Sequence, residues 1–378
     1  MKTLLILILS LFISSCTPKA EIKHRESSDF IYATYSVGEK LKTQEYVAPQ
    51  NLREFDIFYL VASPKWISMD FDQEQSQIYK KYIEKNDYIS YFNHGLIQKY
   101  IDNIHETGGK VLCSFPGQQF IEIASIPERR IKFADMMAQF IKKFNYDGIE
   151  LCWEQTVNIS LHLNFIVEIR EALDRLNLKK HLYLITTLQP HYQYTQKQAE
   201  DLCKYIDWIN LTFYDMEGNS WKGRMKSPNA SLQQIKQLIK NWQHFAPQKL
   251  CIGLPSYGFH YKNRQPEAIT EEDKNFANRG RYCNYIELPE LLQKGWYEKW
   301  DSISQSSYFI SPDNNEFMTL ESYRSLDAKL NWIQKNGFKG IFWQEFHCDW
   351  IAPAKAGERG KHLIMDYVTK KIKPEFEL

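Results

Sequence analysis

The chain has 378 residues, of which 43% are hydrophobic and 15% aromatic, so it is long enough to bury a large core. Its formal net charge is +1 and its basic residues are spread along the chain, so neither nucleic acid nor a membrane surface is indicated as a charge-selected partner. The 23 Tyr, 22 Phe and 10 Trp suit a carbohydrate-binding cleft, but they suit an ordinary large core equally well.

The first 15 residues are predicted to be an export signal. Lys2 precedes an apolar run over residues 4–13, which is too short to span a bilayer comfortably. The following Ser14-Ser15-Cys16 completes a stretch that resembles the cleavage box of bacterial lipoproteins, in which the Cys becomes the lipid-carrying first residue. This resemblance implies that residues 16–29 form a flexible tether and that the protein is exported and anchored in a bacterial membrane, on the periplasmic side or at the cell surface. Plain secretion with an incidental Cys16 is the alternative.

From residue 30 on, apolar strand-like runs alternate with amphipathic helical runs. Strands are expected at 30–35, 55–61, 110–115, 144–154, 182–187, 208–215, 249–255 and 340–343. Helices are expected at 96–107, 130–143, 161–176, 195–205, 231–245, 320–336 and 361–371. This alternation predicts an α/β fold, a (β/α)8 TIM barrel of parallel strands wrapped in helices. An open doubly wound sheet is disfavoured because Gly-x-Gly-x-x-Gly follows none of the early strands.

Residues 259–319 are the one long interruption of this pattern. They contain Gly280, Pro289, Gly295 and Pro312, and are predicted to be an insertion between strands seven and eight. An insertion at that place would wall one side of the cleft at the carboxyl end of the barrel. Residues 30–378 are therefore expected to form one folding unit.

The six cysteines other than Cys16 are irregularly spaced and form no Cys-x-x-Cys pair, so mostly buried free thiols are expected. His347 and Asp349 near strand eight raise the possibility of a metal site. A third partner at ligand spacing is missing from the sequence, which favours ordinary polar residues. We therefore expect no metal and no cofactor. We also expect the protein to be a monomer.

The fourth expected strand carries an unusual pattern of carboxylates. Its apolar face would hold Ile149, Leu151 and Trp153, and its other face Glu150, Cys152 and Glu154. A half-exposed edge strand would explain that polar face through contact with water. Inside a barrel, however, buried carboxylates are unfavourable unless they serve a site at the carboxyl end of the strand, and Glu154 would lie nearest to that end.

Residues 147–154, Asp-Gly-Ile-Glu-Leu-Cys-Trp-Glu, resemble the strand-four signature of glycoside hydrolase family 18, which reads Asp-Gly-x-Asp-x-Asp-x-Glu. Four more stretches resemble family motifs in the same order. Residues 109–117 are similar to the strand-three Ser-x-Gly-Gly motif, with Pro116 for its first Gly, and residues 210–215 to Met-x-Tyr-Asp, with Thr212 for Met. Residues 253–258 match Gly-Leu-Pro-x-Tyr-Gly. Residues 340–343 resemble the strand-eight motif, whose final Trp is either Trp343 or, from the spacing to Asp349, replaced by Gln344.

The resemblance implies hydrolysis of a β-1,4 bond after an N-acetylglucosamine unit, with retention, in chitin-type oligomers, peptidoglycan fragments or the core of N-glycans. Glu154 would donate the proton to the glycosidic oxygen while the acetamido carbonyl of the sugar attacks the anomeric carbon, and would then act as the base for water. It implies catalytic roles for Tyr214, which would bond the acetamido oxygen, for Asp215 and for Glu150, which replaces the family's Asp. The expected substrate-binding residues are Cys152, Asp147, Trp343, Tyr257, Tyr35 and Gln189.

Cys152 departs from the family pattern, which has Asp at this position. That Asp orients the acetamido group and shares a proton with the catalytic Glu, whereas a thiol is a weak acceptor. Two hypotheses follow. The protein is a hydrolase of N-acetylglucosamine-containing glycans, with reduced activity, or it is a lectin-like relative that binds such glycans without cleaving them.

Overall fold

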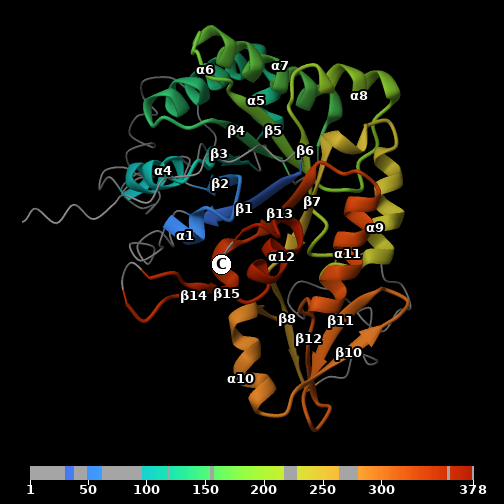
Figure 1. The fold of residues 1–378 in the computed structure, drawn as a ribbon. Coiled ribbons are helices and arrows are strands. Elements are labelled where there is room, and N and C mark those ends of the chain that lie inside the picture. Colours follow the sequence, from blue (N-terminus) through green and yellow to red (C-terminus); the bar gives the residue numbers. More distant parts are fainter. Residues whose placement is uncertain are drawn as a thin grey trace, which may run out of the picture.

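Eight parallel strands close into a barrel in the order β1-β13-β7-β6-β5-β4-β3-β2. The computed structural model describes residues 30–37, 49–61, 96–117, 120–153, 157–216, 228–263, 280–355 and 358–376. Because β1 pairs with both β2 and β13, the sheet is closed, which confirms the predicted barrel (Figure 1). The barrel strands are β1 (Ile31–Val37), β2 (Ile57–Val61), β3 (Lys110–Pro116), β4 (Gly148–Cys152), β5 (Tyr183–Leu188), β6 (Ile209–Leu211), β7 (Leu250–Pro255) and β13 (Gly340–Gln344).

Helices surround the barrel, and several of them begin where a side chain caps the first turn. Asn158 accepts a hydrogen bond at the start of α7, and Thr195 and Ser322 form capping boxes before α8 and α11. The predicted helix at 231–245 is regular only to Leu238 and continues as a 3-10 turn. The helices of the barrel layer are α1 (Pro49–Leu52), α4 (Leu96–Glu106), α5 (Phe120–Ser125), α6 (Pro127–Lys143), α7 (Ile159–Arg175), α8 (Gln196–Cys203), α9 (Leu232–Leu238), α11 (Tyr323–Lys335) and α12 (Met365–Ile372).

The interior of the barrel is filled largely by aromatic side chains. The ring of Tyr35 lies 5.0 Å from that of Tyr59 and 5.8 Å from that of Phe342, measured between centroids. Below them, Trp208 Nε1 donates to Asn210 Oδ1 at 3.1 Å. These bulky groups leave the barrel packed rather than open, which confines a site to its carboxyl end.

At the amino-terminal end of the barrel, three aspartates tie neighbouring strands together. Each precedes an even-numbered strand and accepts a backbone N–H from the strand before it. The bonds run from Tyr32 N to Asp56 (2.9 Å), from Val111 N to Asp147 (2.9 Å) and from Leu184 N to Asp207 (2.8 Å). Each carboxylate also contacts a basic side chain, namely Lys373, His105 with Lys180, and His181, respectively. This repeated arrangement closes the strand edges where backbone donors would otherwise lack partners.

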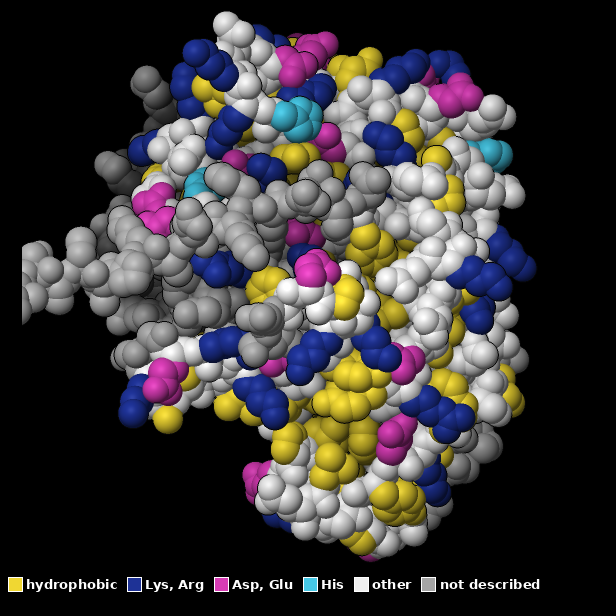
Figure 2. Space-filling view, viewed as in Figure 1, with side chains coloured by type: hydrophobic (Ala, Val, Ile, Leu, Met, Phe, Trp, Pro, Cys, Tyr) yellow, Lys and Arg dark blue, Asp and Glu magenta, His cyan; other side chains and the backbone are white. Residues whose placement is uncertain are grey.

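The insertion between β7 and β13 folds into a five-stranded antiparallel sheet in the order β10-β11-β12-β8-β9. The sheet projects from one side of the barrel (Figure 1), and Figure 2 shows hydrophobic side chains gathered in the part of the surface where it lies. Its first strand follows β7 after a single residue, so the insertion is continuous with the barrel wall. Its elements are β8 (Tyr257–Lys262), β9 (Arg281–Asn284), α10 (Leu288–Gln293), β10 (Tyr297–Asp301), β11 (Ser306–Ile310) and β12 (Glu316–Met318).

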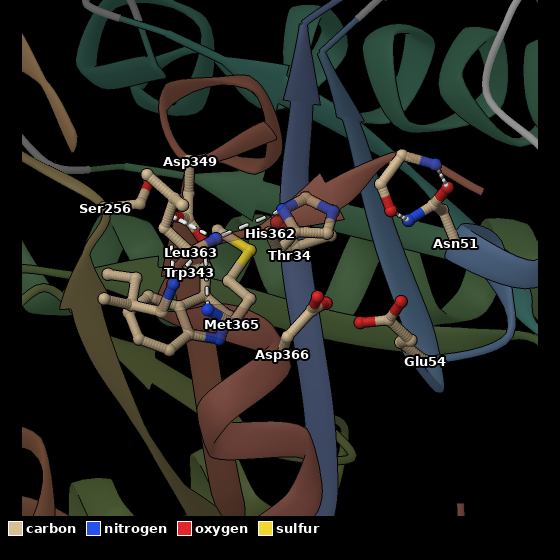
Figure 3. A network of polar contacts seen from close by, with 12 residues as sticks. Thr34, Asn51, Glu54, Ser256, Trp343, Asp349, His362, Leu363, Met365 and Asp366 are labelled. Atoms are coloured by element: carbon tan, nitrogen blue, oxygen red, sulfur yellow. Dashed lines mark hydrogen bonds and ion pairs between the residues drawn. The ribbon is translucent and has the colours of Figure 1, made fainter. Parts of the chain in front are cut away.

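After β13, the chain turns through β14 (Trp350–Ile351) and β15 (Lys361–His362) into α12, which packs on the outside of β1 and β13. Asp349, completely buried, fixes this turn by accepting the backbone N–H groups of residues 363–365 (Figure 3). Ile364 is the N-cap of α12 and Met365 its first residue, so the carboxylate completes the helix start. Within the described part of the chain, no three His, Cys, Asp or Glu side chains are grouped so as to hold a metal ion.

The six cysteines of the described residues are free thiols, and four of them, Cys113, Cys251, Cys283 and Cys348, are buried. Burial raises the pKa of the Cys251 thiol, as expected for an inert core cysteine. None of the helices within the described ranges is both long and apolar enough to cross a membrane. Cys16 lies outside the described residues.

Candidate active site

Polar groups from β1, β4 and β5 meet inside the barrel near its carboxyl end. The Tyr35 hydroxyl donates to Glu150 Oε1 at 2.9 Å and lies 2.9 Å from Thr187 Oγ1. Glu150 is completely buried. Burial and the nearby Glu150 carboxylate raise the pKa of Tyr35, so the phenol stays protonated and remains a donor. These contacts hold the Glu150 carboxylate in one orientation beneath the mouth of the barrel.

Cys152 occupies the next inward-facing position of β4, and it is partly exposed where Glu150 is not. The parallel register places it opposite Thr187 of β5. Glu154, the expected proton donor, lies outside the described residues, and its role therefore stays a prediction.

A second group of polar side chains comes from the segments that follow β6 and β7. The Tyr257 hydroxyl donates to Asp215 Oδ1 at 2.6 Å. Asn229 fixes both partners, because its Oδ1 accepts the Asp215 N–H and its Nδ2 donates to the Tyr257 carbonyl, each at 2.8 Å. Asp215 has a positive φ of 54°, a conformation that Asp adopts more readily than most residues and that these bonds support. Burial, followed by the Asp215 charge, raises the pKa of Tyr257.

Phe342 of β13 stands between the two groups. Its ring centroid is 5.8 Å from that of Tyr35 and 6.1 Å from that of Tyr214, so it separates the β1–β4 side from the β6–β7 side. Gly253 makes room for this arrangement. A Cβ at Gly253 would lie 2.6 Å from the Phe342 ring and 2.9 Å from that of Tyr214. The glycine of the Gly-Leu-Pro motif is therefore required by the packing of two rings at the base of the site.

The family model for glycosyl hydrolases family 18 matches residues 42–349, most of the chain. The chain belongs to this family. Chitinase 1 of Aphanocladium album is 24% identical over 261 residues, which cover 62% of this chain and 61% of that protein. Endochitinase of Manduca sexta is also 24% identical, over 56% of this chain and 44% of that protein. The chain thus spans only about half of the length of the curated relatives it matches.

Solved structures of family 18 chitinases share the fold. The crystal structure of the GH18 chitinase from Cycas revoluta in complex with (GlcNAc)3 superposes with a TM-score of 0.67 at 15% identity. The similarity covers 92% of this chain and 99% of that one. At this level of identity the comparison establishes the barrel of the family 18 protein.

The structure corrects the expectation that Trp343 floors the sugar site of the family 18 protein. Phe342 faces the barrel interior, so its neighbour Trp343 faces outward, where it is completely buried and donates from Nε1 to the Tyr32 hydroxyl at 3.0 Å. Figure 3 shows Trp343 beside Met365 of α12. Gln344, which is partly exposed at the end of β13, holds the inward position instead.

Asp147 is likewise not a substrate-binding residue. It precedes β4 and so lies at the amino-terminal end of the barrel, where it accepts from His105 Nε2 at 2.7 Å and from Val111 N at 2.9 Å. Although burial opposes ionisation, these hydrogen bonds and the nearby Lys180 lower the pKa of Asp147. Gln189 is partly exposed directly after β5, at the same end of the barrel as Glu150, and its role stays a prediction.

Sequence reasoning missed Thr187, Asn229 and Phe342. The inward alternation of β5 could have indicated Thr187, and that of β13 could have indicated Phe342. Asn229 carries no such signal, because it lies in a loop 14 residues after Asp215.

Proposed function

We propose that this family 18 protein hydrolyses β-1,4 linkages next to N-acetylglucosamine, with retention of configuration and with Glu154 as general acid and base. The observation that carries the proposal is the pairing of two preorganised groups at the carboxyl end of the barrel, Tyr35 with Glu150 on one side and Tyr257 with Asp215 on the other. Such fixed donors and charges are what stabilise developing charge in a transition state.

Each group has a step to perform. Glu154 protonates the glycosidic oxygen as the C–O bond breaks, and the acetamido oxygen of the same sugar bonds to the anomeric carbon to give an oxazolinium ion. Tyr214 donates to that acetamido oxygen, and Asp215, held by Tyr257, fixes the sugar. Water then attacks the anomeric carbon, losing its proton to Glu154, and the acetamido group is restored. Glu150 supplies a fixed negative charge beneath the β4 end, which favours the protonated form of Glu154.

Substrates of this kind are named for relatives of the protein. The relatives in Aphanocladium album and Manduca sexta are chitinases, and the Cycas revoluta chitinase was crystallised with (GlcNAc)3. We therefore place chitin-type oligomers first among the substrates, with the core of N-glycans second.

Cys152 supports a second candidate, a glycan-binding protein that cleaves slowly or not at all. Its thiol stands at the inward, partly exposed position of β4 where the family signature has Asp. A neutral thiol accepts hydrogen bonds weakly and carries no charge to orient the acetamido group. Gln344 at the inward end of β13 also supports this second candidate, because an amide replaces an aromatic platform for the sugar ring.

The two candidates are separated by assaying a chromogenic chitobioside and a high-mannose glycoprotein with the unaltered protein and three variants. A hydrolase cleaves at least one substrate, and Glu154→Gln abolishes turnover while Glu171→Gln, on the exposed face of α7, does not. A lectin binds N-acetylglucosamine oligomers without product, and Cys152→Asp then gains activity. Turnover that survives in Glu154→Gln would refute the proposed mechanism.

We also propose that the protein is a bacterial lipoprotein anchored through Cys16. The described chain begins with β1 at the amino-terminal end of the barrel, opposite to the candidate site, an arrangement that suits an anchor upstream of residue 30. Metabolic labelling with a fatty acid tests this proposal. Label should enter the unaltered protein, and Cys16→Ser should remove the label and release the protein from the membrane fraction.

A further inference from the structure

A buried histidine lies directly outside β4, on the face away from the candidate site. His162 of α7 is completely buried, and its Nε2 lies 2.9 Å from Thr186 Oγ1 of β5. Thr186 Oγ1 in turn donates to the carbonyl of Leu151 in β4 at 3.1 Å. A hydrogen-bonded chain therefore runs from the helix layer, through β5, to the backbone of β4 at Leu151, two residues before Trp153.

The hydrogen-bond directions in this chain are determined by its chemistry. Because the Thr186 proton is used on the Leu151 carbonyl, Thr186 Oγ1 must accept from His162, so the imidazole carries its proton on Nε2. Nδ1 is then the acceptor, and the Tyr194 hydroxyl lies 3.5 Å from it. Burial lowers the pKa of His162 to about 3, so the ring stays neutral and keeps these directions at every working pH.

The imidazole of His162 also packs against Trp153, the residue directly after β4. The rings of His162 and Trp153 meet edge to face at 5.5 Å, and Phe120 contacts the Trp153 ring at 5.4 Å. Trp153 N–H lies 3.0 Å from the Thr187 carbonyl, so the backbone there is bonded to β5 as well. Trp153 immediately precedes Glu154 in the sequence.

The adjacent threonines of β5 thus hold β4 from both sides. Thr187 faces inward and contacts the Tyr35 hydroxyl, which bonds Glu150, whereas Thr186 faces outward and bonds the Leu151 carbonyl. The outward half of this arrangement depends on His162, which reaches Thr186 from α7. This half lies between the barrel strands and α7, on the face of β4 away from the candidate site.

We propose that His162 is a positioning residue, which through Thr186 and Trp153 fixes the backbone at the carboxyl end of β4, directly before Glu154 in the sequence. The kinetic consequence rests on the proposed function, whereas the structural consequence does not. Misplacing a catalytic group by about 1 Å lowers the rate on the order of a hundredfold without requiring weaker binding.

The kinetic test compares His162→Phe, which keeps a ring against Trp153, with His162→Gln, which keeps a donor and an acceptor. We expect kcat on an N-acetylglucosamine oligomer to fall about 10- to 100-fold in His162→Phe and in Thr186→Val, with KM changed less than about threefold. His162→Gln should recover most of kcat and leave the pH–rate profile unchanged, because the ring acts while neutral. Combining His162→Phe with Thr186→Val should cost little more than either change alone.

The control is Ile169→Ala, which opens a cavity on the buried side of the same helix away from the chain of bonds. It should lower Tm at least as much as His162→Phe and leave kcat unchanged. An unchanged kcat in His162→Phe despite a lower Tm, as expected for this control, would overturn the proposal. A Gln variant as impaired as the Phe variant would overturn it as well.

Hydrogen exchange separates this proposal from the hydrolase proposal. Under native conditions, the amides of residues 151–153 should exchange at least about tenfold faster in His162→Phe and Thr186→Val than in Ile169→Ala. If the unaltered protein cleaves no oligomer, the hydrolase proposal fails and this measurement alone decides the positioning role. Unchanged exchange at these amides would refute it.

Discussion

The two ends of β4 carry acidic side chains in opposite circumstances. At its amino-terminal end, Asp147 accepts from His105, from Lys180 and from a backbone N–H of β3. Three residues later, Glu150 is sealed inside the barrel beside the phenol of Tyr35. The first carboxylate is surrounded by positive charge and donors, so its ionised form stabilises the fold. The second is held among aromatic rings, where an ionised group is unfavourable.

This contrast extends around the barrel. Asp56 and Asp207 repeat the arrangement of Asp147 at the amino-terminal end, each with a backbone N–H of a neighbouring strand. At the other end, Asp215 accepts from Tyr257 in a strained backbone conformation. Carboxylates therefore contribute to stability at one end and to a preorganised site at the other, as expected for a barrel whose active site lies at the carboxyl ends of its strands.

Between the two ends of β4, the largest expected effect is the fall in rate caused by Glu150→Gln. The amide keeps the size of the side chain and a partner for Tyr35 but removes the charge under the β4 end. We expect kcat to fall on the order of a hundredfold, which is about 2.7 kcal/mol, while the urea midpoint stays equal or rises because a buried charge is gone. Glu290→Gln, at an exposed ion pair, is the control and should leave both quantities unchanged. A lower urea midpoint together with unaltered kcat would reverse the assignment of Glu150.

Asp147→Ala should show the opposite pattern. It leaves the Val111 N–H buried and removes a partner of His105 and Lys180, so we expect unfolding free energy to fall by about 2 kcal/mol. Because this end of β4 is remote from the candidate site, kcat per folded molecule should be unchanged. Urea unfolding and active-site titration measure the two quantities. The matched change Asp135→Ala, at an ion pair half exposed on both sides, should cost less than about 0.5 kcal/mol.

The comparison of the two ends also shows where sequence reasoning succeeded. The eight strands and the inward face of β4 were predicted from the sequence pattern. Every second residue of a barrel strand faces the interior, so apolar and polar residues alternate along it. The prediction that Trp343 faces the site was wrong because of the same alternation. The strand-eight motif left its end uncertain by one residue, and a shift of one residue exchanges the inner and outer faces of a strand.

Other parts of the site depended on tertiary structure that no local pattern contains. Asp147 belongs to the family signature, but its position before the strand places it at the stabilising end. Asn229 bonds both Asp215 and Tyr257, although it lies 14 residues from the first and 28 from the second along the chain. The five-stranded insertion was predicted only as an irregular stretch, because its strands have three to six residues and cannot show a clear period.

A smaller effect is expected in the pH dependence of stability. Because the pKa of Asp147 is lower in the folded chain than the value of about 3.9 in unfolded chains, its contribution is complete above that value. The contribution is lost as the pH falls through the folded pKa. The difference in unfolding free energy between the unaltered protein and Asp147→Asn should therefore be constant from about pH 5 to 8 and shrink below about pH 4. A difference that grows on acidification would contradict the assigned charge.

The smallest expected effect concerns His181, the most exposed of the basic side chains that contact Asp56, Asp147 and Asp207. His181 Nε2 lies 2.7 Å from Asp207 Oδ1, but the His181 side chain is 58% exposed, so water competes for the contact. His181→Ala should lower the unfolding free energy by less than about 0.5 kcal/mol, while Asp207→Ala should cost more because the buried Leu184 N–H loses its acceptor. Urea unfolding of both variants decides between charge and backbone pairing as the source of stability at this end. Equal losses in the two variants would show that the His181 contact, rather than the bond to the neighbouring strand, holds β5 to β6.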